Sequence, residues 1–97
     1  MDRPRIYVDF NEMIDTQTVL LSQSDVKRDS SGAEVELREG LAVYLYMDDI
    51  GERGAPDPLL AQGLIVRNEN AGWAKAAKWL CRIDSNGIRH ESDFLKD

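Results

Sequence analysis

The sequence predicts a small, mainly β domain, built as a barrel or sandwich of about five to seven short antiparallel strands. Three observations lead to this prediction. Apolar residues alternate with a period of two in several segments, as they do in half-buried strands. Two turn sequences of the same chemistry, at residues 29–32 and 84–87, are typical of hairpin tips. The one segment rich in helix formers, residues 71–80, is so short that a helix there is marginal without packing, and we expect at most one short helical turn.

Length and composition are typical of one globular unit. The chain has 97 residues, of which 42% are hydrophobic, so we expect a single domain over residues 1–97. No window approaches the roughly 18 apolar residues of a membrane span, and no apolar stretch follows residues 1–5 as it would in a signal peptide. The single cysteine, Cys81, excludes an internal disulfide and fits a reducing compartment. We therefore expect a cytoplasmic protein without membrane contact.

Four segments carry the clearest strand patterns. Apolar side chains alternate through residues 6–10, and residues 18–21 form a short run rich in strand formers. In residues 41–47 both alternating sets are apolar, so this strand is either covered on both sides or presents a surface patch. Residues 60–66 alternate too, and Gly63 within them suggests a bulge or a bend.

The segment at residues 71–80 is ambiguous because it combines helix formers with strand-like alternation. Its alanines and lysines favour a helix, whereas Trp79, Cys81 and Ile83 alternate as a strand. We expect a loop or a single helical turn near Trp73, followed by a strand from about Ala77. Residues 13–17 could hold another turn of helix.

The two turns allow a prediction of register. If all four turn residues form the loop, Val26 lies opposite Val35 and Ile83 lies opposite Ile88; a three-residue loop would instead place Val26 opposite Glu36. Burial of one face favours the register that matches apolar residues, so we expect the four-residue loops. This register also places Cys81 directly opposite His90.

The order of elements between Gly40 and Val66 resembles the hairpin of an SH3-like small β-barrel. The resemblance rests on Gly40, the strand at residues 41–47, a long polar loop, and the strand at residues 60–66 with its internal Gly63. It covers about a quarter of the chain and implies a fold only, because SH3-like barrels serve several functions. It assigns no functional residue here.

Cys81 and His90 form the sharpest candidate for chemistry. A Cys–His pair within hydrogen-bond reach can generate a nucleophilic thiolate or supply two metal ligands. The alternative is that Cys81 is a small buried hydrophobe, since the same face carries Trp79, Ile83 and Ile88. Zinc normally requires more nitrogen and sulfur ligands than these two residues provide. The buried-hydrophobe interpretation is favoured.

The loop at residues 48–58 is the most acidic segment. Its carboxylates, Asp48, Asp49, Glu52 and Asp57, could bind a hard cation such as Ca²⁺ through oxygen. Their spacing does not match a helix-loop-helix calcium loop, and Arg53 lies among them. A solvated hairpin loop is the favoured interpretation, and no metal or other cofactor is expected.

Aromatic and basic residues gather in the C-terminal half, which invites comparison with single-stranded nucleic-acid binding. The residues concerned are Arg67, Trp73, Lys75, Lys78, Trp79, Arg82 and Arg89. Glu91 and Asp93 partly cancel this charge, and the net charge of −6 repels phosphate at long range. We therefore expect nucleic acid not to be the partner.

Tyr44 and Tyr46 lie on one face of the strand at residues 41–47. If this face is exposed, the two rings form an amphipathic platform of a kind enriched in interaction sites; if it is covered, they belong to the core. With Trp73, these tyrosines are the candidate binding residues. No phosphate-binding loop, nucleophile elbow or zinc motif occurs. The leading hypothesis is therefore a non-enzymatic domain that binds a protein or peptide.

Overall fold

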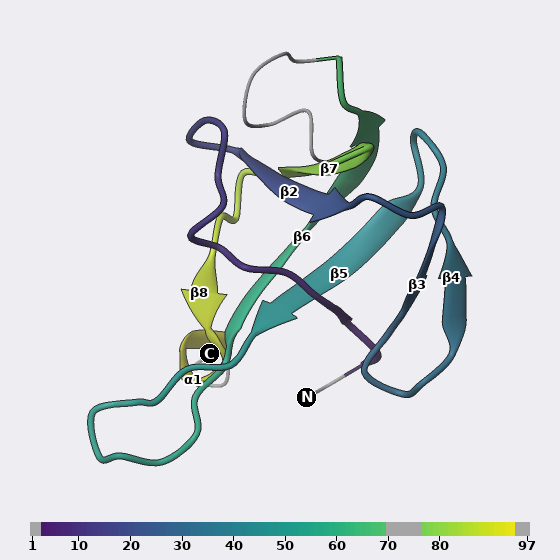
Figure 1. Ribbon diagram of the computed structural model, residues 1–97. Coiled ribbons are helices and arrows are strands. Elements are labelled where there is room, and N and C mark those ends of the chain that lie inside the picture. Colours follow the sequence, from purple (N-terminus) through teal and green to yellow (C-terminus); the bar gives the residue numbers. More distant parts are fainter. Residues whose placement is uncertain (1–2, 70–76, 95–97) are drawn as a thin grey trace.

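The computed structural model describes residues 3–69 and 77–94 (Figure 1). Within them the chain is mostly β, which confirms the predicted fold class. The strands are β1 (Ile6–Tyr7), β2 (Thr18–Ser22), β3 (Val26–Arg28), β4 (Glu34–Glu36), β5 (Ala42–Met47), β6 (Leu59–Arg67), β7 (Trp79–Ile83) and β8 (Arg89–His90), and one helical turn, α1 (Glu91–Phe94), follows them.

Six strands form one curled sheet in the order β1-β5-β6-β7-β2, with β8 also paired to β6. The sheet resembles half of a barrel, and β3 and β4 form a separate two-stranded ribbon beside it (Figure 1). Contrary to the expectation of antiparallel pairing throughout, β1 pairs parallel to β5. The residues between them include β2, β3 and β4, and so long a connection permits a parallel neighbour, which a tight hairpin cannot supply.

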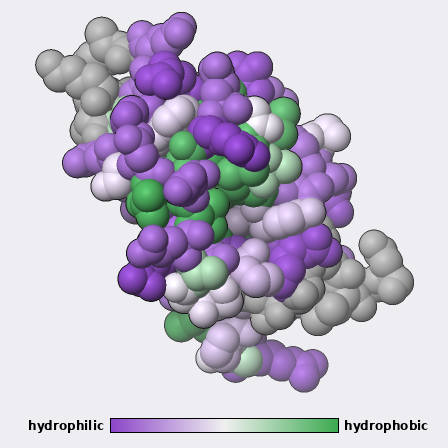
Figure 2. Space-filling model, turned by 90° about the vertical axis from the view of Figure 1, so that its right-hand side faces the viewer, coloured by the Kyte–Doolittle hydropathy of each residue, from purple (hydrophilic) through white to green (hydrophobic). Residues whose placement is uncertain are grey.

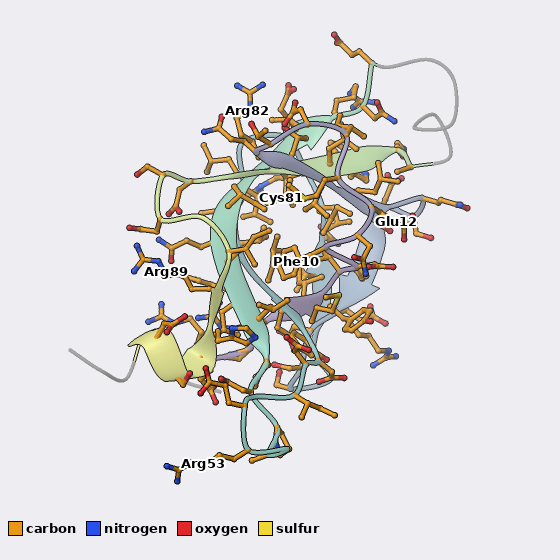
Figure 3. The ribbon with its side chains drawn as sticks, turned by 90° about the vertical axis from the view of Figure 1, so that its left-hand side faces the viewer. Phe10, Glu12, Arg53, Cys81, Arg82 and Arg89 are labelled. Atoms are coloured by element: carbon orange, nitrogen blue, oxygen red, sulfur yellow. The ribbon has the colours of Figure 1, made fainter. Side chains whose placement is uncertain are left out.

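The concave face of the sheet holds the hydrophobic core. Alternate residues of β5 and β6 face it, as the period-two pattern predicted, and Leu45 and Ile65 are fully buried there. The chain between β1 and β2 crosses the open side of the sheet. Its Phe10 is buried and points into the interior, as does Cys81 (Figure 3). The core therefore lies between the curled sheet and this crossing segment.

Gly63 allows the backbone of β7 to approach β6 closely. A Cβ atom at Gly63 would lie 2.0 Å from the carbonyl oxygen of Arg82, a distance that no side chain tolerates. The pairing of β6 with β5 and with β7 continues through Gly63 without a shift of register. Of the predicted bulge or bend, the bulge is therefore not formed, and the glycine allows the close approach of a neighbouring strand.

The turn at residues 29–32 has the predicted chemistry, but the predicted register of its hairpin is wrong. The Asp29 carboxylate accepts from the Ser31 amide, and Gly32 has a φ of +87°. Val26 lies opposite Glu36, and Lys27 lies opposite Val35, as a three-residue loop requires. Val35 packs against the core, and the Lys27 amine bonds to the main sheet, so a lysine takes the position expected for a valine.

The second turn also forms, but it does not connect a hairpin. The Gly87 amide donates to the carbonyl of Asp84 at 3.0 Å. Beyond this turn β8 continues along the same edge of β6 that β7 occupies, so both strands pair with β6 rather than with each other. The predicted pairing of Ile83 with Ile88 is therefore wrong. The length of β6 explains this, because it offers an edge to both strands.

The remaining expectations concern helices. Residues 13–17 form bends and one isolated bridge rather than a turn of helix. The strand expected from about Ala77 begins at Trp79, and the expected turn near Trp73 lies outside the described residues. In the described part of the chain, α1 is a single turn, and no helix has the length and apolar character needed to cross a membrane.

Candidate functional site

The tyrosines of β5 lie on the convex face of the sheet. Ala42, Tyr44 and Tyr46 point away from the core, and the register with β6 places Gln62 and Leu64 on the same face. Leu64 is 51% exposed, which is unusual for a leucine in a long central strand. The convex side of the sheet therefore presents apolar and aromatic groups next to one another.

Tyr7 of β1 extends this aromatic surface. Its ring lies at 5.5 Å from the ring of Tyr46 with an interplanar angle of 79°, which is an edge-to-face contact. Tyr7 is 44% exposed, whereas Tyr44 and Tyr46 are half-buried. We call Tyr7, Tyr44 and Tyr46 the tyrosine cluster. Tyr7 was not among the residues expected from the sequence, although its alternation with Ile6 and Val8 already indicated an outward side chain.

Two arginines of the N-terminal segment cover part of the cluster. The guanidinium carbon of Arg3 lies 4.4 Å from the centre of the Tyr44 ring, and that of Arg5 lies 5.6 Å from it. Arg5 is buried, and its Nη1 donates to the carbonyls of Leu45 at 3.2 Å and Ala61 at 3.1 Å. The tyrosines are thus neither fully exposed nor fully buried, and two arginine side chains cover Tyr44 in part.

A shallow hollow of about 190 Å³ adjoins Tyr44 on this face. It is lined by Ala42, Gly63 and Leu64 among others, and Gln62 donates to the Asp84 carboxylate at 2.7 Å on its border. The hollow is therefore largely apolar, with one fixed polar pair beside it. Trp73, the third binding candidate from the sequence, lies outside the described residues.

Cys81 and His90 lie far apart. Cys81 is opposite Ile65 on β6, whereas His90 is opposite Leu59, six residues away along the same strand, which corresponds to about 20 Å. Cys81 is 0% exposed, and burial raises the pKa of its thiol to about 12. The register that placed the two side chains opposite each other is wrong, so the structure does not bring them together as a catalytic pair or as joint metal ligands.

Two carboxylates of the acidic loop anchor it to the C-terminal segment. This loop, residues 48–58, projects from the ends of β5 and β6 as a finger (Figure 1). Asp49 lies 2.7 Å from Nε2 of His90, and Asp57 accepts from the amide and the hydroxyl of Ser92. These donors lower the pKa of Asp49 and of Asp57.

The other two carboxylates of the finger, Asp48 and Glu52, are exposed. Within residues 3–69 and 77–94, no group of three or more His, Cys, Asp and Glu side chains is placed to hold a metal ion. The finger also carries Ile50, which is 67% exposed. The acidic loop therefore has a structural attachment at its base and an apolar side chain on its surface.

Of the aromatic and basic residues of the C-terminal half, Trp73 and Lys75 lie outside the described residues, and the described ones form no stacking platform around Trp79. Its ring is buried, its Nε1 donates to Asp25 at 2.9 Å, and Arg67 lies 4.9 Å from the ring centre. Lys78 pairs with the same Asp25 at 2.7 Å. The Trp79 ring is thus not available to stack on a base. Arg82 and Arg89 point away from the body of the molecule (Figure 3).

Comparison with known proteins adds no relative. The chain matches no protein-family model, and searches of curated proteins and of solved structures found no match either.

Proposed function

We propose that this protein is a non-enzymatic interaction domain that binds an extended segment of another protein on its convex face. The observation that carries the proposal is the continuity of this face: the exposed Tyr7 edge, the half-buried tyrosines of β5, and the exposed Leu64 beside the hollow. Aromatic side chains that are fixed by their neighbours bind a partner at low entropic cost. SH3-like barrels also include peptide binders, but the proposal uses none of their residues.

The chemistry of the face indicates the kind of segment. Apolar residues also reach the surface on another side of the molecule: seen from the side of β3 and β4, hydrophobic residues gather between hydrophilic ones (Figure 2). On the convex face, Arg3 stands over Tyr44, and Arg82 lies next to Leu64 in the sheet. These arginines place positive charge beside Tyr44 and Leu64, while the Asp84 carboxylate on the border of the hollow accepts from Gln62. A peptide with an apolar side chain for the hollow and flanking carboxylates suits this surface.

A thiol-dependent enzyme is the less favoured candidate, because Cys81 is buried with a raised pKa and His90 is bonded elsewhere. Single-stranded nucleic-acid binding is also less favoured, because the Trp79 ring is enclosed by its own neighbours. We further propose that the protein acts in the cytoplasm, for which its single cysteine is the supporting observation.

Selection from a random peptide library on the immobilised protein tests the proposal. We expect acidic peptides with a central apolar residue, and fluorescence polarisation then measures their Kd values. Leu64→Asp should weaken binding by about thirtyfold or more, as expected for a central contact that gains a repulsive charge. Tyr7→Ser should also weaken it.

Ile50→Ser is the matched control, because Ile50 is at least as exposed as Leu64 but lies on the finger. Its Kd should equal that of the wild type. Circular dichroism confirms that each variant is folded. Equal peptide binding by wild type and Leu64→Asp would remove this face as the site. Binding of labelled single-stranded oligonucleotides at low salt, with no selected peptide, would contradict the proposal as a whole.

A further inference from the structure

Lys27 lies in the seam between the two edges of the main sheet. The strands β1 and β2 are the outermost strands of the curled sheet, and no ladder of hydrogen bonds joins them in the described part of the chain. The Lys27 amine donates to the carbonyl of Tyr7 at 2.7 Å and to the carbonyl of Leu21 at 2.8 Å. A side chain of the β3 ribbon therefore connects the two edges where a closed barrel would have paired strands.

A pocket of about 250 Å³ opens at this seam. Its lining includes Val8, Asp9, Glu12, Leu20, Leu21 and Lys27. Pockets for drug-sized ligands measure roughly 300–1,000 Å³, so this pocket suits a smaller molecule. Among its apolar residues, Leu20 is half-buried, whereas Val8 and Leu21 belong to the core. The lining also has one cationic and two anionic side chains.

The amine of Lys27 has capacity for a ligand. An ammonium group has three donors, and among the residues that the structure describes Lys27 has two acceptors, which leaves one donor. Burial lowers the pKa of Lys27, and the nearby charge of Glu12 partly opposes this effect. A ligand carboxylate in the pocket would offset the cost of burying this charge.

The two carboxylates of the pocket favour a cationic group. Asp9 accepts from the amide of Asn11 through Oδ1, and its other oxygen remains for a ligand as far as the described residues show. Glu12 is exposed. A ligand with only a negative charge would be repelled by these two groups, whereas a ligand with only a positive charge would be repelled by Lys27.

We propose that this pocket binds a free α-amino acid with an aliphatic side chain, such as leucine. Its carboxylate would accept from Lys27, its ammonium would lie against Asp9 and Glu12, and its side chain would contact the half-buried Leu20. The site is separate from the convex face, although Tyr7 borders both. The proposal therefore does not depend on the proposed peptide binding.

An NMR titration of backbone amides with L-leucine tests the proposal. We expect saturable shifts at Tyr7, Leu21 and Lys27 with a Kd of about 1 mM or below. Isocaproate, which lacks the ammonium, and isoamylamine, which lacks the carboxylate, should each bind about tenfold more weakly or not at all. Equal binding of leucine and isocaproate would show that the carboxylates of Asp9 and Glu12 take no part in binding, and this would overturn the proposal.

Two substitutions locate the site. Glu12→Gln changes an exposed side chain and should raise the Kd of leucine about tenfold, whereas Glu36→Gln on the outer side of β4 should not change it. Lys27→Met should abolish binding, with Arg28→Met in the same strand as its control. If Lys27→Met does not fold, Glu12→Gln decides the question alone. No shift with leucine at about 10 mM, or unchanged affinity in Glu12→Gln, would refute the site.

Discussion

The Asp49 carboxylate lies 2.7 Å from Nε2 of His90, and this contact attaches the finger at residues 48–58 to the C-terminal strand. Asp49 is the second residue after β5, while His90 ends β8, so the contact joins segments that are 41 residues apart. Next to it, the Glu91 amide donates to the carbonyl of Pro58 at 2.8 Å. The base of the finger is thus held by one ionisable pair, by the hydrogen bonds of Ser92 to Asp57 and by this backbone contact.

This pair should make stability depend on pH. The hydrogen bond that the His90 ring donates to the Asp49 carboxylate raises the pKa of His90 above 6.5, so its contribution to stability is complete below 6.5 and is lost as the pH rises through the raised value. The pKa of Asp49 is lowered from 3.8 by the same bond, so its contribution is present above 3.8 and is lost as the pH falls through the lowered value. The pair should therefore stabilise the fold most between pH 3.8 and 6.5.

Asp49→Asn measures this effect. We expect the pKa of His90, followed by NMR of its ring protons, to fall toward 6.5 in this variant. The difference in unfolding free energy between this variant and the wild type should be largest between pH 3.8 and 6.5 and should shrink at higher pH. Asp48→Asn, which removes the neighbouring exposed charge, should have a smaller effect on the pKa of His90. An unchanged pKa in Asp49→Asn would mean that the contact does not form in solution.

Cys81 should be inert toward alkylation in the folded protein. Its side chain is fully buried and burial raises its pKa to about 12, so the thiolate is scarce at pH 8. Mass spectrometry after treatment with iodoacetamide should show no adduct under native conditions and one adduct in guanidinium chloride. Rapid modification of the native protein would revive the hypothesis of a reactive thiol.

Gly63→Ala should destabilise the fold by about 3 kcal/mol, at the upper end for overpacked sites. The added methyl group would meet the Arg82 carbonyl at 2.0 Å, and the backbone of β7 would have to move away from β6. Urea unfolding gives the free energy. Gly51→Ala is the control, because its methyl group meets the nearest atom, the Asp57 Cβ, at 3.1 Å, so the neighbour has to move by only a few tenths of an ångström. An equal loss of unfolding free energy in both variants would contradict the close approach of β7 to β6 at Gly63.

Arg5→Met should destabilise the fold by about 2 kcal/mol, because the buried guanidinium donates to two carbonyls of the sheet. Arg3→Met is the matched control. Arg3 is exposed and stands over the Tyr44 ring, a contact of about 0.5–1 kcal/mol. Urea unfolding of the two variants compares these roles. A larger loss of unfolding free energy in Arg3→Met than in Arg5→Met would show that Arg5 is not the arginine that stabilises the sheet.

The sequence predicted the strands at the centre of the sheet and the chemistry of both turns, because these depend on neighbouring residues. Alternation along residues 41–47 correctly separated an inner aliphatic set from an outer set with Tyr44 and Tyr46. Asp and Gly at the ends of residues 29–32 and 84–87 form turns whether or not the flanking strands pair with each other.

The candidate site was predicted only in part. Tyr44 and Tyr46 were identified from their strand, but the contribution of Tyr7 and the cover by Arg5 depend on the parallel pairing of β1 with β5. No local pattern in residues 3–7 indicates that partner. The sequence alone therefore left open whether the tyrosines are exposed or buried.

By itself, the sequence determined which residues alternate between the two faces of a strand and where the chain turns. Only the tertiary structure decided which strands are neighbours, and so separated Cys81 from His90 and placed Lys27 in the seam of the sheet. The physical reason is that face alternation is set by the backbone of each strand, whereas strand pairing is set by burial of the whole core between segments far apart in the chain.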